Sequence, residues 1–337
     1  MSEVSYLGID VHKKKCVFVE IDSTGKILRR GSFGNTFMEV SDFASSLSPR
    51  IHLVLEPVLD YLWLLDQLEP FVGSVHVAVP FKVRIIAESK CKTDRYDARM
   101  LAELLRVNFL PESWIPSREI RCLRGLVRQR YFLVKQQTMN KNRIRHLLFS
   151  QAVTLKISDV TSPSARRRIA KMSLPTVARQ AIVSCLEIAA TLEMQITALD
   201  DHIKDQVMEN ETVSLLKTIP GVGPVRSAVI YGEIGDITRF NGPKALASYS
   251  GLTPSIRASG DSIHQGGITH IGSGPLRHAL VEAAIDVIKK SPSLKRMHTR
   301  ILFRSNKQTA RVAVARKLAV IIYRMLSRRE AFRRNVA

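Results

Sequence analysis

Four acidic residues in the first hundred positions have the types and spacing of a divalent-metal site. Asp10 directly follows the apolar run of the first predicted strand, and Glu56 ends the apolar run of a later one. Asp94 and Asp97 are three residues apart, so they point the same way at the start of a helix. Four carboxylates aimed at one point repel one another unless cations lie between them. Two Mg²⁺ ions about 3.5–4 Å apart, held by carboxylates, serve phosphodiester chemistry.

Each of these carboxylates also has a structural interpretation when it is taken alone. Asp94 is expected as the N-cap of a helix that begins near Arg95, with Asp97 in the first turn. A strand-end Asp, a strand-end Glu and a D-x-x-D pair, in this order on one α/β unit, form a much more specific pattern than any single member. The set therefore predicts a metal-dependent reaction on a phosphodiester.

A second segment has the pattern of a helix-hairpin-helix turn. Gly221 and Gly223 lie in the string 219–228, ahead of a predicted helix. Glycines let backbone N–H groups approach a phosphate, and the helix N-terminus adds its dipole. Arg226 adds a positive charge. A tight helical turn with no ligand is the alternative interpretation.

A Gly/Ser-rich loop over 247–277 is the third candidate. Arg257 and Arg277, together with two histidines, could surround a scissile phosphate with hydrogen-bond donors. Ser259 and Ser262 lie in the same stretch. From composition alone, a serine in such a loop forms a turn more often than it acts as a nucleophile.

The elements that hold the carboxylates alternate in type. Three sequential strands are followed by helix, strand, helix and strand, which predicts an α/β sheet with an antiparallel start. A further helix closes the unit. The predicted strands are 4–9, 16–21, 26–33, 51–55 and 75–79, and the predicted helices are 36–47, 61–68 and 95–107.

Beyond residue 116 the sequence becomes helical. Residues 118–149 carry nine Lys/Arg and one acid, and 182–203 have apolar residues at alternating steps of three and four, as in a coiled coil or a long helical hairpin. That pattern fits a helix packed inside its own domain as well as an oligomer interface. Residues 291–337 are helical again, with 13 Lys/Arg and one acid, a density that favours phosphate contact.

The charge of the chain is unevenly distributed. Its 337 residues have a net charge of +21, but residues 1–117 hold 14 Lys/Arg and 15 Asp/Glu, a net −1. Residues 118–337 therefore carry a net +22. A composition of 45% hydrophobic and 24% charged residues excludes disordered, collagen-like and disulfide-scaffold classes. The pattern indicates a near-neutral domain joined to a basic part that holds nucleic acid.

The cysteines and the N-terminus indicate the cellular compartment of the protein. Four cysteines lie far apart with no zinc-site spacing, which indicates reduced thiols. The N-terminus lacks the pattern of a secretory signal, and the longest apolar run, near 318–323, is too short to cross a bilayer. We predict a cytoplasmic protein with no membrane partner.

With these motifs in place, the chain resembles the DEDD transposases of the IS110 insertion-sequence family, relatives of the Piv DNA invertase. The resemblance is carried by Tyr6–Asp10 and by the string 92–103, and the motifs match from residue 6 to about 280. It implies a RuvC-like DEDD domain of RNase H fold at 1–117, a basic helical or coiled-coil segment at 118–212, and a mainly α, serine-bearing transposase domain at 213–337. One departure is at Glu56, which is followed by Pro57 where the family commonly has Ala-Thr-Gly.

The same resemblance implies a transposase that cleaves and exchanges DNA strands. Ser259, which follows the string Gly251–Pro254 and precedes Gly260, would be the nucleophile, with Ser262 as its rival. The implied partners are DNA (element ends and target), a structured guide RNA, and further copies of the chain in a dimer or tetramer. The implied cofactor is Mg²⁺, with Mn²⁺ as a substitute, held by Asp10, Glu56, Asp94 and Asp97.

Two other classes of protein remain open. A nuclease of the Holliday-junction-resolvase type would use the same carboxylates with water and would not need Ser259. A non-catalytic nucleic-acid-binding protein would need only the basic part, and four acids at metal-binding spacing argue against it.

The charge distribution predicts where non-specific nucleic-acid affinity lies. A fragment of residues 118–337 should retain most of that affinity and lose it steeply with salt, because binding releases counterions. A fragment of 1–117 should bind weakly. Titration of both fragments with labelled duplex DNA at two salt concentrations tests this, and comparable affinities at moderate salt would contradict it.

Overall fold

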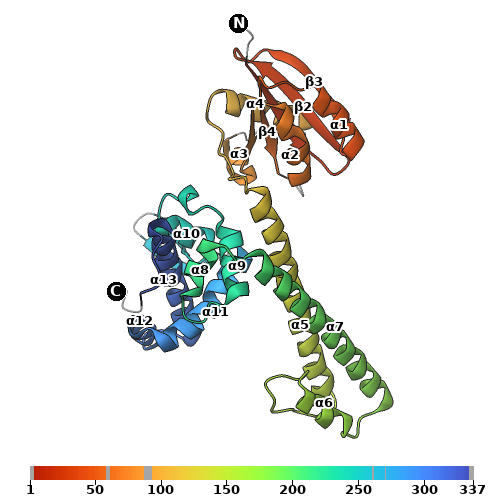
Figure 1. The fold of residues 1–337 in the computed structure, drawn as a ribbon, viewed down its shortest axis with the longest axis vertical. Coiled ribbons are helices and arrows are strands. Elements are labelled where there is room, and N and C mark those ends of the chain that lie inside the picture. Colours follow the sequence, from red (N-terminus) through yellow and green to blue (C-terminus); the bar gives the residue numbers. More distant parts are fainter. Residues whose placement is uncertain (1–3, 58–60, 87–92, 260–261, 270, 334–337) are drawn as a thin grey trace. The chain divides into compact units, whose positions relative to one another are not determined.

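The computed structural model describes residues 4–57, 61–86, 93–259, 262–269 and 271–333, with 256–259 and 262–265 described by their backbone alone. The chain forms two compact units, Met1–Ile115 and Pro116–Ala337. Figure 1 shows the ribbon of both. The first unit is α/β and the second is mainly helical, as the sequence predicts.

A five-stranded sheet forms the centre of the first unit, with the strand order β3-β2-β1-β4-β5. β1 pairs antiparallel with β2 and parallel with β4, and β2–β3 is antiparallel while β4–β5 is parallel. The predicted antiparallel start is therefore confirmed. The strands are β1 (Ser5–Val11), β2 (Lys15–Asp22), β3 (Ile27–Gly34), β4 (Ile51–Glu56) and β5 (Ser74–Val77).

Helices pack on both faces of this sheet. Because side chains alternate along a strand, Leu7 and Ile9 of β1 lie in one hydrophobic cluster with residues of α1 and α2. The opposite face carries α4, whose Ala98 and Ala102 pack against β2. The helices are α1 (Phe37–Ser45), α2 (Leu62–Leu68), α3 (Pro80–Ile86) and α4 (Asp94–Arg106), with a 3₁₀ turn η1 (Glu69–Phe71). Of these four helices, α3 was not predicted from the sequence.

Gly8 lets α4 lie directly on β1. A Cβ atom at this position would lie 2.0 Å from the carbonyl oxygen of Ala98 and 2.8 Å from the amide nitrogen of Ala102. Any side chain there would push the helix away, because both neighbours are backbone atoms. Gly8 and Asp10 share a strand face, so the contact also brings the start of α4 toward Asp10.

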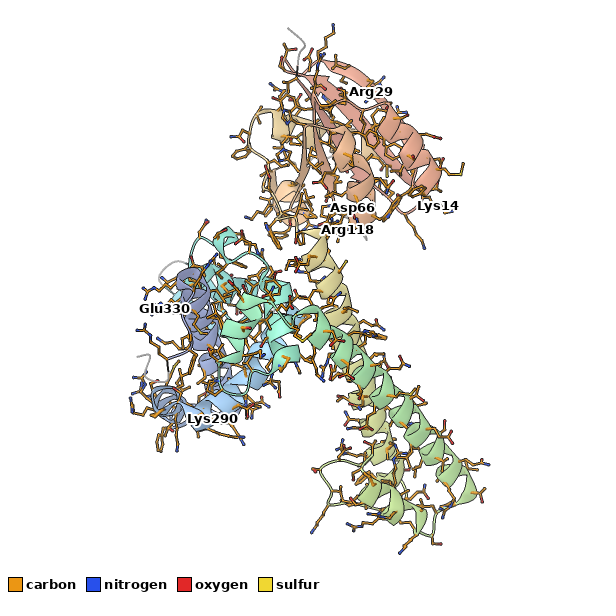
Figure 2. The ribbon with its side chains drawn as sticks, in the orientation of Figure 1. Lys14, Arg29, Asp66, Arg118, Lys290 and Glu330 are labelled. Carbon is orange, nitrogen blue, oxygen red and sulfur yellow. The ribbon has the colours of Figure 1, made fainter. Side chains whose placement is uncertain are left out.

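The second unit begins with a long helical hairpin. α5 (Arg118–Phe149) packs against α7 (Thr176–Gln206), with α6 (Pro163–Ala170) in the connection (Figure 1); Arg118 is labelled at the start of α5 in Figure 2. The buried residues of α7 recur every seven positions, and they are Ile182, Ala189, Ile196 and Ile203. This is coiled-coil spacing, so the predicted helical hairpin is confirmed.

α7 also has a weakly buried apolar surface. By length and composition it is the one described helix that could cross a membrane, which is weak evidence for a membrane span. Only 11% of the most apolar 18-residue stretch of α7 is buried. Val177, Met194 and Ile188 are 79%, 61% and 50% exposed.

A helical bundle follows the hairpin. Its core lies around α11 and α13 and includes Leu280, Ala284, Leu318 and Ile322. Residues 254–268, predicted as part of a loop, instead contain an antiparallel pair of strands; the frequent Gly and Ser residues obscure the alternation of apolar and polar side chains. The elements are α8 (Glu211–Lys217), α9 (Pro224–Ile234), η2 (Ile237–Arg239), α10 (Pro243–Tyr249), β6 (Pro254–Ser259), β7 (Ser262–Ile268), α11 (Gly274–Lys290), α12 (Pro292–Leu302) and α13 (Lys307–Arg328).

Gly8→Ala should destabilise the first unit by about 1–3 kcal/mol, the usual cost of overpacking a filled core. Both tryptophans, Trp63 and Trp114, belong to this unit, so tryptophan fluorescence during urea unfolding reports on it. Gly125→Ala in α5 is the matched control, because a Cβ there would meet nothing within 4 Å. It should leave the tryptophan transition unchanged, and equal midpoints for wild type and Gly8→Ala would refute the packing argument.

Candidate metal centre

Asp10 lies near the end of β1, on the sheet face that α4 covers. It is only 6% exposed. In the parallel register of β1 and β4, its partner is Glu56, the last residue of β4. Paired residues of neighbouring strands share a face, so the structure brings these two predicted ligands to adjacent positions.

The start of α4 brings two more of the predicted ligands to this place. Thr93 is the N-cap, because its hydroxyl accepts a hydrogen bond from the Tyr96 amide at 3.2 Å. The prediction that Asp94 caps the helix is therefore wrong, since a threonine one residue earlier takes that role. Asp94 is instead the first helical residue, and Asp97 lies in the first turn, as predicted.

His12 joins this cluster and was not identified from the sequence. Its Nε2 atom lies 3.0 Å from Asp10 Oδ2 and 3.4 Å from Asp94 Oδ2. Lys15 Nζ lies 3.3 Å from the same Asp94 oxygen. Within the described part of the chain, Asp10, His12 and Asp94 are the one group of three potential ligands whose ligand atoms lie within 4.8 Å of one another. The only sequence signal for His12 is its place two residues beyond Asp10.

The electrostatics of the cluster are unbalanced toward negative charge. Burial raises the pKa of the Asp10 carboxyl, the nearby charges of Asp97 and Asp94 raise it further, and His12 opposes them. Asp94 behaves differently: the hydrogen bond from Lys15 holds its pKa below the usual value. Of these two carboxylates, Asp10 therefore gains more from an added cation.

A divalent cation fits these residues. His12 Nε2 is buried and, among the described atoms, has no partner in hydrogen-bond geometry although it lies close to two carboxylates. Carboxylate oxygens are the ligands that hard cations prefer, and an imidazole nitrogen that lacks a hydrogen bond can complete such a set. The donor chemistry is compatible with a divalent metal.

The glycine turn predicted to contact phosphate lies in the second unit, between α8 and α9. Gly221 has φ +81°, and a Cβ there would lie 2.2 Å from Cβ of Asp286, so glycine is required. Gly223 is the N-cap of α9 and faces open space. The Arg226 guanidinium donates to the Gly221 carbonyl and lies 3.5 Å from Asp286 Oδ2, so internal contacts already hold this arginine.

The serine segment forms the β6–β7 hairpin. Ser259 ends β6 and pairs with Ser262, the first residue of β7, while Arg257 pairs with His264. The side chains of these four residues lie outside the described atoms, so their roles stay predictions. Arg277 in α11 donates to the Ser250 carbonyl at 3.3 Å.

The base of this hairpin is held by a buried acid that sequence reasoning missed. The Glu233 carboxylate is fully buried and accepts hydrogen bonds from Arg128 at 2.8 and 3.1 Å and from the Ser273 hydroxyl at 3.0 Å. Burial raises the pKa of Glu233, but the Arg128 hydrogen bonds and charge outweigh it, so the pKa lies below its usual value. Nothing in the sequence marks this residue, because Arg128 is 105 positions away.

Both units contain segments that match transposase family models. A transposase family model of the DEDD IS110 type matches residues 7–151, and the model of the transposase IS116/IS110/IS902 family matches residues 213–299. The transposase for insertion sequence element IS1111A of Coxiella burnetii is 27% identical, over 99% of this chain and 92% of its own length. The pilin gene-inverting protein of Moraxella bovis is also 27% identical, over 98% of both chains. A 43.6 kDa protein of insertion element IS110 from Streptomyces coelicolor is 26% identical over 70% of this chain and 71% of its own.

The raised pKa of Asp10 gives a pH-dependent stability. The folded state keeps the proton to a higher pH than the unfolded chain, so the stabilising contribution is complete below about pH 4 and is lost as pH rises through the folded pKa. Asp10→Asn has no such charge. In a chelating buffer at pH 7, this variant should unfold at a higher urea concentration than wild type.

Mg²⁺ should reverse that order. It should raise the urea midpoint of the wild type by mass action and leave Asp10→Asn unchanged. Tryptophan fluorescence at pH 4 and pH 7, with and without Mg²⁺, measures both effects. An Asp10→Asn variant less stable than wild type at pH 7 without metal would contradict the assignment.

Proposed function

The chain belongs to the IS116/IS110/IS902 family of transposases, and from this we propose that it moves an insertion sequence by cleaving and exchanging DNA strands. The observation that carries the proposal is the convergence of Asp10, Asp94 and His12 within the part of the chain that matches the DEDD family model. Gene inversion, which the name of the Moraxella relative describes, also requires DNA strands to be cleaved and exchanged.

We propose that Asp10, Glu56, Asp94 and Asp97 hold Mg²⁺, with Mn²⁺ as a substitute. Bound there, the ions would polarise the scissile phosphodiester and stabilise the leaving oxygen. Asp10 and Glu56 come from adjacent strand positions, so the sheet sets their separation. Asp94 and Asp97 come from the first turn of α4, where the helix dipole also favours negative charge. Lys15 neutralises part of the Asp94 charge and so lowers the repulsion within the set.

Ser259 is the proposed nucleophile. Its Oγ would attack the phosphorus and form a phosphoserine bond as the P–O bond to one DNA strand breaks, and the serine proton would end on the departing DNA oxygen, which leaves as a hydroxyl. A hydroxyl of another DNA strand would then attack the phosphoserine and release the serine. The phosphodiester energy is kept throughout, so no external energy source is needed.

The contacts at the base of the β6–β7 hairpin support this role for Ser259. The Thr269 amide donates to the Thr253 carbonyl at 2.9 Å, and the Ser273 amide donates to the Tyr249 carbonyl at 2.8 Å. Gly272 has φ +123°, and a Cβ there would lie 2.1 Å from the Tyr249 oxygen. The chain therefore enters and leaves the hairpin at fixed points, which would limit the movement of Ser259 during attack.

The partners proposed are DNA element ends, target DNA, a structured guide RNA and further copies of this chain in a dimer or tetramer. The net charge of +22 over 118–337 supports nucleic-acid binding. The exposed apolar residues of α7 support self-association. We also propose that the protein acts in the cytoplasm without a membrane.

Ser259→Ala should fold and bind DNA but form no covalent protein–DNA adduct, because alanine lacks the attacking oxygen. Ser262→Ala is the matched control and should still form the adduct. Asp10→Asn, Asp94→Asn and Asp97→Asn should each abolish the adduct and plasmid recombination while DNA binding persists. Denaturing gel electrophoresis of a labelled nicked substrate detects the adduct.

Three outcomes would change this assignment. An adduct retained in Ser259→Ala and lost in Ser262→Ala would move the nucleophile to Ser262. Cleavage by wild type with no adduct would favour a water-using nuclease of the resolvase type. Normal recombination in all three aspartate variants would refute the metal site.

A further inference from the structure

The end of the helical hairpin carries a concentration of positive charge that the reaction above does not use. We call residues 141–179 the hairpin tip; they comprise the last turns of α5, the connection, α6 and the first residues of α7. This segment, all of which the structure describes, holds nine Lys/Arg and a single acid, Asp159.

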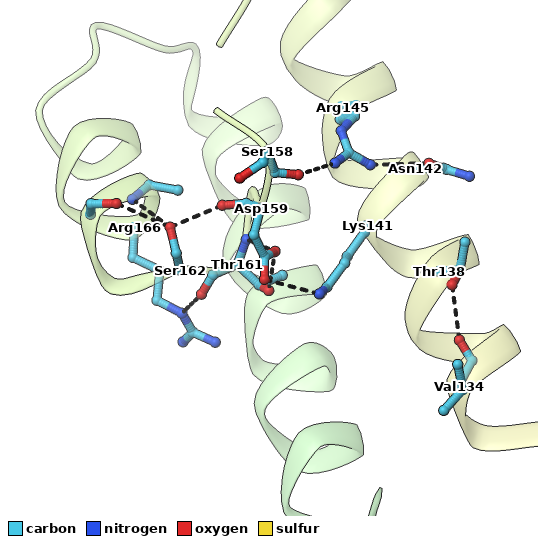
Figure 3. A network of polar contacts seen from close by, with 12 residues as sticks. Val134, Thr138, Lys141, Asn142, Arg145, Ser158, Asp159, Thr161, Ser162 and Arg166 are labelled. Carbon is cyan, nitrogen blue, oxygen red and sulfur yellow. Dashed lines mark hydrogen bonds and ion pairs between the residues drawn. The ribbon is translucent and has the colours of Figure 1, made fainter. Parts of the chain in front are cut away.

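Internal contacts account for three of these cations and for the acid. Lys141 Nζ pairs with Asp159 Oδ2 at 3.1 Å, and the amide and hydroxyl of Thr161 donate to Asp159 Oδ1 (Figure 3). Arg166 donates to the Thr161 carbonyl at 2.9 Å, and Arg179 donates to the Met172 carbonyl at 2.6 Å. Burial raises the pKa of Asp159, but the hydrogen bonds from Thr161 and Lys141 outweigh it and lower the pKa to about 2. Asp159 is therefore ionised at neutral pH and already paired.

The other six cations of the tip are exposed and have no acid of this segment left to neutralise them. Arg145 is partly fixed, since it donates to the Ser158 carbonyl at 2.8 Å and to Asn142 Oδ1 at 3.2 Å, as Figure 3 shows. The six are Arg143, Arg145, Lys156, Arg167, Arg168 and Lys171. A group of this kind attracts a polyanion.

The hairpin tip also contains a cavity of about 340 Å³, and Arg145 is the one cation of these six that lines it. Val153 and Leu155 contribute apolar walls, and Arg145, His146 and Thr154 contribute polar groups. Phe149 also lines it, and this residue is 72% exposed. The chain turns back over the end of α5 at Ala152, which has φ +58°, a conformation that alanine rarely adopts.

An exposed aromatic ring at an apolar cavity, in a segment that carries six exposed cations, is a combination that suits unpaired nucleotides. The ring stacks on a base, and the cations contact the phosphates on either side. Duplex DNA fits less well, because its base faces are covered by stacking within the helix. A cavity of this size is at the lower end of the range for small ligands, which suits a single base.

We propose that the hairpin tip binds a single-stranded nucleic acid, with one unpaired base stacked on Phe149 and neighbouring phosphates contacted by the exposed cations. The strand is either RNA or displaced single-stranded DNA, which share this chemistry. The inference deepens the proposed function by locating a nucleic-acid site in it, but none of the residues involved has a role in strand cleavage.

The test uses the full-length protein and oligonucleotides that carry 5-iodouracil, which cross-links to a stacked aromatic ring on irradiation. We expect the cross-linked peptide to contain Phe149. Phe149→Leu keeps an apolar side chain and should lower the cross-link yield and weaken binding of a single strand about tenfold. Phe132→Leu, in the same helix and 51% exposed, is the matched control and should behave as wild type.

The cations are tested in the same assay. Arg167→Gln combined with Arg168→Gln should reduce the slope of log affinity against log salt for a single strand by about 0.7 for each phosphate that the variant no longer neutralises. RNA and DNA versions of the oligonucleotide distinguish the two sources, since the natural ligand should cross-link more strongly. A cross-link located entirely outside 141–179, or an unchanged yield in Phe149→Leu, would overturn the proposal.

The result is separable from that of strand cleavage. A wild-type protein that forms the Phe149 cross-link but no phosphoserine adduct would retain the hairpin-tip site and lose the proposed nucleophile. A wild-type protein that forms the adduct but no Phe149 cross-link would retain the proposed nucleophile and lose the hairpin-tip site.

Discussion

The direct contact between α4 and β1 is the constraint on which the metal centre depends. Three carboxylates interact electrostatically there, one of them buried, and their mutual repulsion opposes folding of this region. Backbone packing at Gly8 holds them together, because the absent side chain allows Ala98 to lie against the strand. The cluster is therefore held by close packing in spite of its charge, and this leaves its negative potential available to a cation.

In the second unit, a buried charge also holds separate elements together, but by attraction. Glu233 joins α9 to Arg128 of α5 and to Ser273, the N-cap of α11. Removing one partner of such a pair leaves an unpaired buried charge, which costs about 3–5 kcal/mol. The β6–β7 hairpin, which bears Ser259, lies between α10 and α11. The contacts of Glu233 therefore connect α5 to one end of the segment that contains this hairpin.

The sequence predicted the parts of the fold that depend on local pattern. Seven-residue spacing identified α7, and strand-end acids together with a D-x-x-D pair identified four carboxylates that the fold brings to neighbouring positions or into electrostatic contact. It failed where a neighbouring residue competes for the same role, as Thr93 does with Asp94. It also failed where the partner is distant: His12 follows a strand with no periodic signal, and the burial of Glu233 depends on an arginine of another helix.

The regular burial along α7 has a consequence for how such chains can change in length. Because an α-helix turns about 100° per residue, inserting one residue would rotate everything beyond it and expose Ile182 or Ile203 to solvent. Inserting seven residues in α7 and seven in α5 keeps the buried residues of α7 facing α5 and lengthens the hairpin by about 10 Å. The length of the helical hairpin can therefore change only in steps of seven residues per helix. Natural or engineered variants with longer or shorter hairpins should differ by whole multiples of seven residues in each helix.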